Sequence, residues 1–348
     1  MSPYILFALM FGLGLGTTLT FASSHWLLAW MGIEMNTLAF IPLMAQRHHP
    51  RAVEATTKYF LAQAAAAAVL LFAALTNAWL TGQWDIQQTL SPTPTAMLTC
   101  ALALKVGLAP FHTWLPEVLQ GLDLTTGLIL STWQKLAPFA LLFQIHPLHP
   151  TLITTLGLTS ALVGGWGGLN QTQLRKILAY SSIAHLGWMV LVVQFSPPLA
   201  KLTLILYITM TAAIFLVLKL NDSKNINTLA SSWSKAPTIA ALAPLILLSL
   251  GGLPPLTGFM PKWLILHELT KQELSLLATI MAIGALLSLY FYLRLSYAMA
   301  LTISPNNISG TPPWRFTSPS LKLILAILTT CSIALLPLAP ALASLSPL

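Results

Sequence analysis

The chain has 348 residues, of which 56% are hydrophobic and only 7% are charged. Soluble domains carry about 25% charged residues, so this composition excludes a soluble globular protein and indicates an integral membrane protein. The net charge of +8 does not indicate nucleic-acid binding, because the basic residues are scattered through short loops and form no tail or patch. Cys100 and Cys331 stand alone in apolar segments, and their spacing excludes zinc, iron–sulfur and haem sites.

Apolar runs long enough to cross a ~30 Å hydrocarbon core recur along the whole chain. They predict an all-α polytopic membrane protein with about eleven transmembrane helices. The predicted spans are 3–21, 25–44, 59–80, 95–120, 125–145, 151–169, 174–194, 199–220, 238–269, 274–297 and 321–342. The first residues contain neither a basic region nor a cleavage site, so we expect no secretory signal or transit peptide.

The basic residues lie almost entirely in loops on one side of these spans. Two of them, Lys201 and Lys271, fall after odd-numbered spans, and eleven fall on the other side. Those eleven are Arg47, Arg51, Lys58, Arg175, Lys176, Lys219, Lys224, Lys235, Arg294, Arg315 and Lys322. By the positive-inside rule the N-terminus faces the positive side, which in a mitochondrion is the matrix, and the C-terminus faces the opposite side.

An internal repeat is visible at an offset of 145 residues. LALKVGLAPFHTWLPEVL, from Leu102, matches LLSLGGLPPLTGFMPKWL, from Leu247, and both contain GLxPxxxxxP. Pro110 in the first copy, and Pro254 and Pro255 in the second, predict a break in the fourth and ninth spans. An odd difference in span number places the copies in opposite orientations, an arrangement typical of transporters with a site near the bilayer midplane.

Three ionisable side chains fall near the middle of predicted spans: Glu34 in the second, Lys105 in the fourth and Lys135 in the fifth. A charge in the hydrocarbon core is expensive and marks either a structural ion pair or a proton or ion pathway. Burial disfavours the charged form of a lysine and a nearby carboxylate favours it, so such groups can be tuned to exchange protons near neutral pH.

Lys262 follows the second predicted break, and its span is longer than the others. It is either a fourth buried charge or a lysine at the membrane interface. His112 beside the first break and His185 in the seventh span can relay protons, with an unperturbed pKa of about 6.5, or can simply be satisfied by hydrogen bonds within the bundle. Helix breaks at membrane depth are tolerated where they line a wet cavity, so the sequence predicts a hydrated path populated by these groups.

Several long motifs resemble those of the antiporter-like, proton-pumping membrane subunits of respiratory complex I, of the vertebrate mitochondrial kind. They are WMGIEMN around Glu34, LKVGLAPFHTWLPEV around Lys105, STWQKLAP around Lys135, LRKILAYSSIAHLGW around His185, and GGLPPLTGFMPKW ending just past Lys262. The resemblance covers essentially the whole chain. It implies two inverted five-helix repeats, residues 1–146 and 150–297, then a loop, 298–320, and a C-terminal helix, 321–348.

The resemblance also implies roles for four residues. Glu34 pairs with Lys105 on the first broken helix, and Lys135 passes the proton toward Lys262 on the second. Most family members carry three further helices at the N-terminus, which the resemblance implies are missing here.

The implied function is proton translocation across the inner mitochondrial membrane, coupled to electron transfer from NADH to ubiquinone in other subunits. The chain has no dinucleotide fingerprint, cluster cysteines or flavin motif, so NADH, flavin, iron–sulfur clusters and ubiquinone are expected elsewhere in the complex. Expected partners are the other membrane subunits, including neighbouring antiporter-like ones, and lipids. Two alternatives remain open: a cation/proton antiporter subunit of the multisubunit type, and a purely structural membrane subunit.

Overall fold

The computed structural model describes residues 2–46, 48–87, 91–145, 149–234, 237–300, 321–338 and Ala341. Within these ranges the regular elements are helices, accompanied by two isolated β-bridges, and the predicted all-α class is confirmed. The chain divides into two compact units, residues 1–160 and 161–348, with the boundary inside α8 (Pro150–Gly167).

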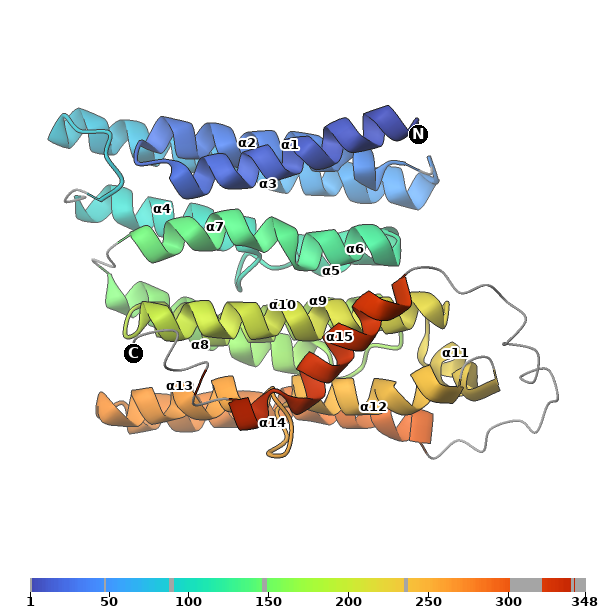
Figure 1. Cartoon of the computed structure of the whole chain (residues 1–348). Helices are drawn as coiled ribbons and strands as arrows, with labels where there is room; N and C mark the ends of the chain where they lie inside the picture. The colour runs from blue at the N-terminus through green and yellow to red at the C-terminus, as the bar shows by residue number, and fades with distance from the viewer. Residues whose placement is uncertain are drawn as a thin grey trace. The chain divides into compact units, whose positions relative to one another are not determined.

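The first unit is built from seven described helices and the start of α8 (Figure 1). They are α1 (Pro3–Ala22), α2 (Trp26–Met44), α3 (Pro50–Thr81), α4 (Pro92–Val106), α5 (Trp114–Gly121), α6 (Leu124–Ser131) and α7 (Trp133–Gln144). Helix α1 packs along α2, α3 packs against α2, α4 and α5, and α7 packs against α1, α2 and α4.

Helices α1 and α2 approach closely because glycines face each other where they meet. A Cβ atom added to Gly16 would lie 2.7 Å from the carbonyl oxygen of Gly32 and 2.9 Å from the amide nitrogen of Asn36. A Cβ at Gly32 would lie 2.8 Å from Cγ2 of Thr20. Small residues of this kind let membrane helices pack backbone to backbone. The contact holds α2, which carries Glu34, against α1.

The second unit contains the rest of α8 and the remaining helices. They are α9 (Leu174–Val193), α10 (Pro197–Leu220), α11 (Ile226–Ala230), the 3₁₀ turn Ser231–Ser234, α12 (Pro237–Gly251), α13 (Phe259–Lys271), α14 (Ser275–Ala300), α15 (Leu321–Ala334) and a 3₁₀ turn, Leu336–Leu338. Helix α10 packs against α9, α12 and α15. Helix α15 crosses α10 obliquely and also contacts α12 (Figure 1).

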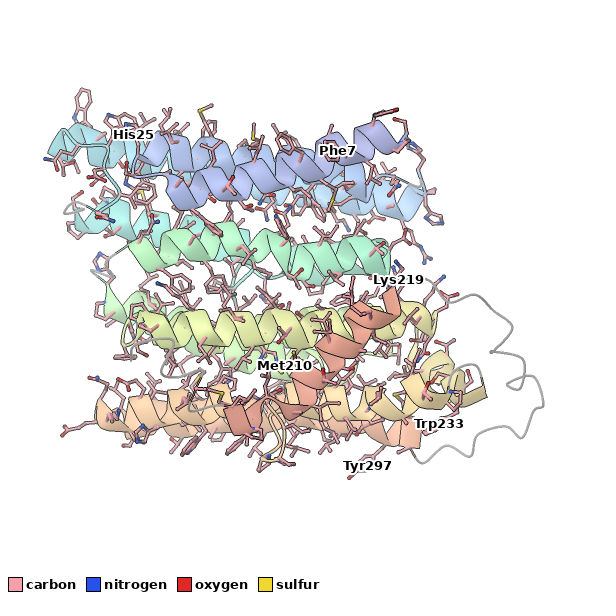
Figure 2. All side chains as sticks on the ribbon, viewed as in Figure 1. Phe7, His25, Met210, Lys219, Trp233 and Tyr297 are labelled. Atoms are coloured by element: carbon pink, nitrogen blue, oxygen red, sulfur yellow. The ribbon has the colours of Figure 1, made fainter. Side chains whose placement is uncertain are left out.

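Six described helices are long and apolar enough to cross a membrane: α1, α2, α3, α9, α10 and α14. Their ends follow local chemistry: proline occupies the first turn of α1, α3, α4 and α10, where a missing N–H group leaves no hydrogen bond unmade. Large apolar side chains cover the outer faces, as Phe7 on α1 and Tyr297 on α14 illustrate with exposed fractions of 70% and 57% (Figure 2). Such a surface suits lipid or other membrane subunits.

Three elements differ from the sequence-based prediction. The expected continuous helix 125–145 is divided at Thr132, which follows α6 and precedes α7 and whose hydroxyl donates to the carbonyl of Leu128 at 2.7 Å. The connection after α10 contains α11 and a 3₁₀ turn, which lack the apolar length that identified the other helices. Helix α3, with 32 residues, begins well before the predicted 59–80.

In each unit, an isolated antiparallel β-bridge joins two linkers, the loops that connect consecutive helices. In the first unit, His25 pairs with Asp85 through backbone bonds from Trp26 N to Trp84 O (3.0 Å) and from Ile86 N to Ser24 O (2.9 Å). In the second unit, the bridge joins Gln173 to Asn225. Its bonds run from Leu174 N to Lys224 O (3.1 Å) and from Ile226 N to Thr172 O (3.3 Å). The two bridges share one hydrogen-bonding pattern.

Candidate proton-transfer site

The break between α4 and α5 begins at a glycine. Gly107 adopts a left-handed conformation, with φ of +86°, and its N–H and that of Leu108 both donate to the carbonyl of Ala103 at 2.9 Å. Glycine at the position after a helix favours this closure because it has no Cβ to clash. The helix therefore ends at Val106, before Pro110, which lies within the interruption. The Ala109–Pro110 peptide bond is cis, and the Thr159 hydroxyl donates to the Ala109 carbonyl at 3.2 Å.

The break between α12 and α13 has the same beginning. Gly252 has φ of +81°, and the N–H groups of Gly252 and Leu253 donate to the carbonyl of Leu248 at 3.1 and 3.3 Å. Helix α12 therefore ends at Gly251, and Pro254 and Pro255 lie in the interruption that follows. In both breaks the left-handed glycine, and not the proline, ends the first half-helix.

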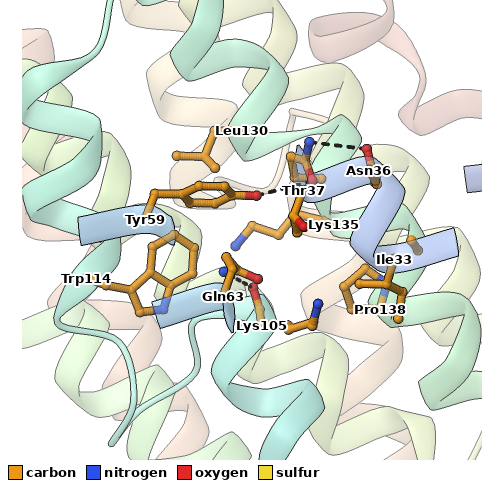
Figure 3. Close-up of a pocket in the computed structure, with 12 residues that line it drawn as sticks. Ile33, Asn36, Thr37, Tyr59, Gln63, Lys105, Trp114, Leu130, Lys135 and Pro138 are labelled. Atoms are coloured by element: carbon orange, nitrogen blue, oxygen red, sulfur yellow. Dashed lines mark hydrogen bonds between the residues drawn. The ribbon is translucent and has the colours of Figure 1, made fainter. Parts of the chain in front are cut away.

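A small cavity lies in the first unit beside the first break (Figure 3). Its lining comes from α2, α3, α4, α5, α6 and α7: Ile33, Asn36, Thr37, Tyr59, Gln63, Lys105, Trp114, Leu130, Gln134, Lys135, Ala137 and Pro138. The cavity volume is about 10 Å³, at the lower limit of what one buried water needs. Two lysines and six side chains bearing hydroxyl, amide or indole groups surround this space, so it is polar enough to hold water.

Lys105 and Lys135 share this cavity but differ in their surroundings. Lys135 is 2% exposed, and its ammonium donates to the carbonyl oxygen of Val106 at 2.6 Å. Lys105 is 5% exposed, and within the described ranges its Nζ has no hydrogen-bond partner. Neither lysine forms an ion pair with a carboxylate among the residues that the structure describes. The structure thus brings two buried cationic groups together without the direct carboxylate contact that a structural ion pair would supply.

Glu34 lies near this site on α2 but does not line the cavity. It is half-buried, its Oε2 has no hydrogen-bond partner among the described residues, and its charge acts electrostatically on Lys105 and Tyr59. Glu34 and Lys105 therefore interact through space without direct contact. Proton movement between them needs a bridging group such as water.

A chain of polar side chains beside the lysines was not identified from the sequence. The hydroxyl of Tyr59 donates to Oε1 of Gln134 at 3.5 Å, and Nε2 of Gln134 donates to Oδ1 of Asn36 at 3.3 Å (Figure 3). Gln63 donates to the backbone carbonyl of Lys105 at 3.4 Å. Neutral polar residues are common in membrane helices, so only their shared position, next to Lys135, marks these as part of the site.

Replacing Gln134 by leucine should destabilise the first unit. The change removes both hydrogen bonds and leaves Asn36 and Tyr59 without partners in a buried setting, which costs about 1–3 kcal/mol. Thermal unfolding of the purified complex measures the loss. Gln144→Leu is the matched control, because Gln144 lies on the same helix outside this chain of hydrogen bonds. Equal effects of the two changes would contradict the assignment.

Lys262 is buried in the second unit, with 9% of its surface exposed. It lies in the first turn of α13, and its Nζ donates to the carbonyl oxygen of Gly251 at 2.7 Å. The alternative of an interfacial lysine would place this ammonium on the protein surface. The observed position, folded back onto the end of α12, favours a buried group of the same kind as Lys135.

His185 lies on α9 in the second unit, and the charge of Lys262 acts on it. Its Nε2 is 3.4 Å from the hydroxyl of Tyr292, and its ring is tilted by 43° against that of Tyr207, with the ring centroids 5.8 Å apart. His112 lies in the first break, with Nδ1 at 3.3 Å from the carbonyl of Pro110. Across the described part of the chain, no cluster of three or more His, Cys, Asp or Glu side chains could hold a metal ion.

Comparison with known proteins relates this geometry to a family. The family model described as "NADH:quinone oxidoreductase/Mrp antiporter, TM" matches residues 23–288, and that of the "NADH dehydrogenase subunit 2 C-terminus" matches residues 289–343. The NADH-ubiquinone oxidoreductase chain 2 of Tetraodon nigroviridis is 68% identical, covering 99% of each chain, and that of Gadus morhua is 69% identical, covering 98% of each.

Solved structures give the same picture. A chain of respiratory complex I from Thermus thermophilus with bound aureothin superposes with a TM-score of 0.86 at 28% identity, covering 99% of this chain and 80% of that one. A chain of the Mrp complex from Dietzia sp. DQ12-45-1b has a TM-score of 0.82 at 17% identity, covering 95% and 74%, and shares the fold. The chain therefore belongs to the NADH:quinone oxidoreductase/Mrp antiporter transmembrane family, and within it to the chain 2 proteins of NADH-ubiquinone oxidoreductase.

Proposed function

We propose that this chain conducts protons through the membrane part of respiratory complex I, with the cavity between Lys105 and Lys135 as its central station. The observation that carries this proposal is the pair of buried ammonium groups without a carboxylate partner. A structural membrane subunit has no use for two buried cations that no carboxylate contacts, because each destabilises the bundle. A proton path needs groups that can lose their charge, and buried lysines do so readily.

In this proposal the path begins at Glu34 on α2, whose charge acts on Lys105 across space. Lys105 then exchanges with Lys135 across the cavity that both line. Lys135 passes the proton toward Lys262 in the second unit, and His112 and His185 act as relays. Because Coulomb coupling is strong in a low-dielectric interior, protonation of one group changes the occupancy of the next.

The wider architecture that we infer is two inverted five-helix repeats, 1–146 and 150–297, followed by a loop, 298–320, and a C-terminal helix, 321–348, with eleven spans in all. The corresponding β-bridges support it, and so do the left-handed glycines Gly107 and Gly252, which lie 145 residues apart. The excess of basic residues on one side favours a matrix-facing N-terminus and an intermembrane-facing C-terminus in the inner mitochondrial membrane.

The electron-transfer chemistry of the complex belongs, in our proposal, to other subunits. NADH, flavin, iron–sulfur clusters and ubiquinone bind there, and this chain supplies proton conduction alone. Its partners are the other membrane subunits, including neighbouring antiporter-like chains, and the lipids that cover its apolar outer face. A role as a cation/proton antiporter subunit is the second candidate, favoured by the likeness in fold to the Mrp complex.

The test is proton uptake driven by NADH oxidation in vesicles that contain the purified complex. With Glu34→Gln, we expect proton uptake to slow about tenfold, the equivalent of ~1.4 kcal/mol of lost charge stabilisation. Glu54→Gln is the control, because Glu54 is an exposed carboxylate that pairs with Lys58 at 2.8 Å. Unchanged uptake with Glu34→Gln would contradict the path, and uptake that requires sodium would favour the antiporter.

A further inference from the structure

The two broken helices present one carbonyl, at the same position, to a buried ammonium group. In the first unit the carbonyl of Val106 accepts from Lys135 at 2.6 Å, and in the second the carbonyl of Gly251 accepts from Lys262 at 2.7 Å. Val106 and Gly251 are related by the offset of 145 residues, and each is the last residue of its half-helix. The two lysines are not related by that offset. The accepting carbonyl therefore occurs at equivalent positions in the two units, although the two donating lysines are not at equivalent positions in the sequence.

The glycine that follows each of these residues leaves the carbonyl free to accept a hydrogen bond. Gly107 and Gly252 hold similar left-handed conformations and return their N–H groups to the preceding turn. This closure leaves the last carbonyls of the half-helix without intrahelical donors, and they carry the partial negative charge of a helix C-terminus. An ammonium group is the natural partner of such a carbonyl, and in a dry interior the interaction is stronger than in water.

Gly252 has a second property that concerns Lys262 alone. A Cβ atom at this residue would lie 2.8 Å from Cδ of Lys262, 3.1 Å from Nζ and 3.2 Å from Cε. The side chain of Lys262 therefore lies directly over the bare Cα of Gly252 on its way to the Gly251 carbonyl. At Gly107 the corresponding Cβ would instead meet Leu115 and Trp114. Only in the second unit does the glycine also make room for the lysine.

We propose that Gly252 is a positioning residue for proton transfer: it aims the Gly251 carbonyl at Lys262 and leaves the space in which the lysine lies. This inference rests on the proposed function, since it assigns Lys262 to the proton path. Gly252 touches no transferred proton itself and acts through the placement of the ammonium group. Any side chain at this residue should displace Lys262 from its acceptor.

The experiment compares Gly252→Ala with Gly82→Ala in the assembled complex, reconstituted in vesicles. Gly82 is also left-handed, with φ of +71°, but a Cβ there meets nothing within 4 Å, so it reproduces the backbone strain without the contact. We expect Gly252→Ala to lower the protons taken up per NADH oxidised about tenfold, because the ammonium loses its acceptor, while Gly82→Ala leaves this ratio unchanged.

A double-mutant cycle with Lys262→Ala identifies the cause. If Gly252 acts through Lys262, the double variant has the same ratio as Lys262→Ala alone. If Gly252→Ala prevents assembly, truncation of Lys262 in the same chain should restore it by removing the atoms that the new Cβ meets. Additive losses, an assembly defect that Lys262→Ala does not relieve, or equal behaviour of the two glycine variants would overturn the proposal.

The same measurements separate this proposal from the function on which it rests. Normal pumping with Lys262→Ala would remove Lys262 from the proton path. Impaired pumping with Lys262→Ala but normal pumping with Gly252→Ala would overturn only the role of the glycine.

Discussion

Replacing Lys105 by methionine will stop proton pumping by the assembled complex without destabilising it. The ammonium of Lys105 is buried and has no hydrogen-bond partner within the described ranges, so its removal leaves no orphaned group behind. Methionine has a similar length and fills the same volume with apolar atoms. The proton then meets a gap where an unsupported charge costs about 3 kcal/mol, which corresponds to passage about 100-fold slower.

The measurement is the ratio of protons taken up to NADH oxidised, together with the melting temperature of the complex. Lys58→Met is the control: Lys58 is exposed and its ion pairs with Glu54 and Glu117, both at 2.8 Å, contribute little to stability. Lys135→Met should also stop pumping but lower the melting temperature, because it leaves the Val106 carbonyl without its donor. Normal pumping with Lys105→Met would remove this residue from the path.

Replacing Gly16 by leucine will prevent the chain from assembling into the complex. The glycine lies against the backbone of α2, where an added Cβ would be 2.7 Å from the Gly32 carbonyl oxygen. Backbone atoms cannot yield as a flexible side chain can, so α1 must separate from α2. Overpacking costs about 1–3 kcal/mol when a core can adjust, and more when it cannot.

Gly14→Leu is the matched control for this change. Gly14 lies on the same helix, and a Cβ there would meet nothing within 4 Å, so leucine at this residue points into open space. Native electrophoresis of membrane extracts measures the amount of assembled complex for both variants. Comparable assembly of the two variants would mean that the close approach of α1 and α2 is not needed in the complex.

The fold class followed from the sequence because a bilayer leaves few solutions. Long apolar segments with little charge can satisfy their backbone groups only as helices, so composition alone predicted an all-α protein. The helix break near Lys105 could also be predicted from the sequence, because Pro110 cannot continue a helix. What the sequence did not reveal is that Gly107 ends the helix earlier, since a glycine in an apolar run has many uses.

The charged residues of the candidate site could be predicted from the sequence, but their hydrogen-bond partners could not. Glu34, Lys105, Lys135 and Lys262 stood out because ionisable residues are rare in such a chain. Their environment depends on tertiary contacts: no spacing predicts that Lys135 reaches the carbonyl of Val106. Residues such as Asn36, Tyr59 and Gln134 carry no charge, so nothing in the chain separated them from other polar residues in membrane helices.

The linker bridges bear on the ancestry of the chain. Both hydrogen bonds in each bridge are made by backbone atoms, so selection can keep the contact while the side chains change. His25 and Asp85 in one bridge correspond to Gln173 and Asn225 in the other, with no residue in common. If the two repeats arose by gene duplication, as our proposal of two repeats implies, both have retained this backbone contact while the residues that form it have changed. Each repeat still joins its own linkers, as an ancestor consisting of a single repeat would have had to.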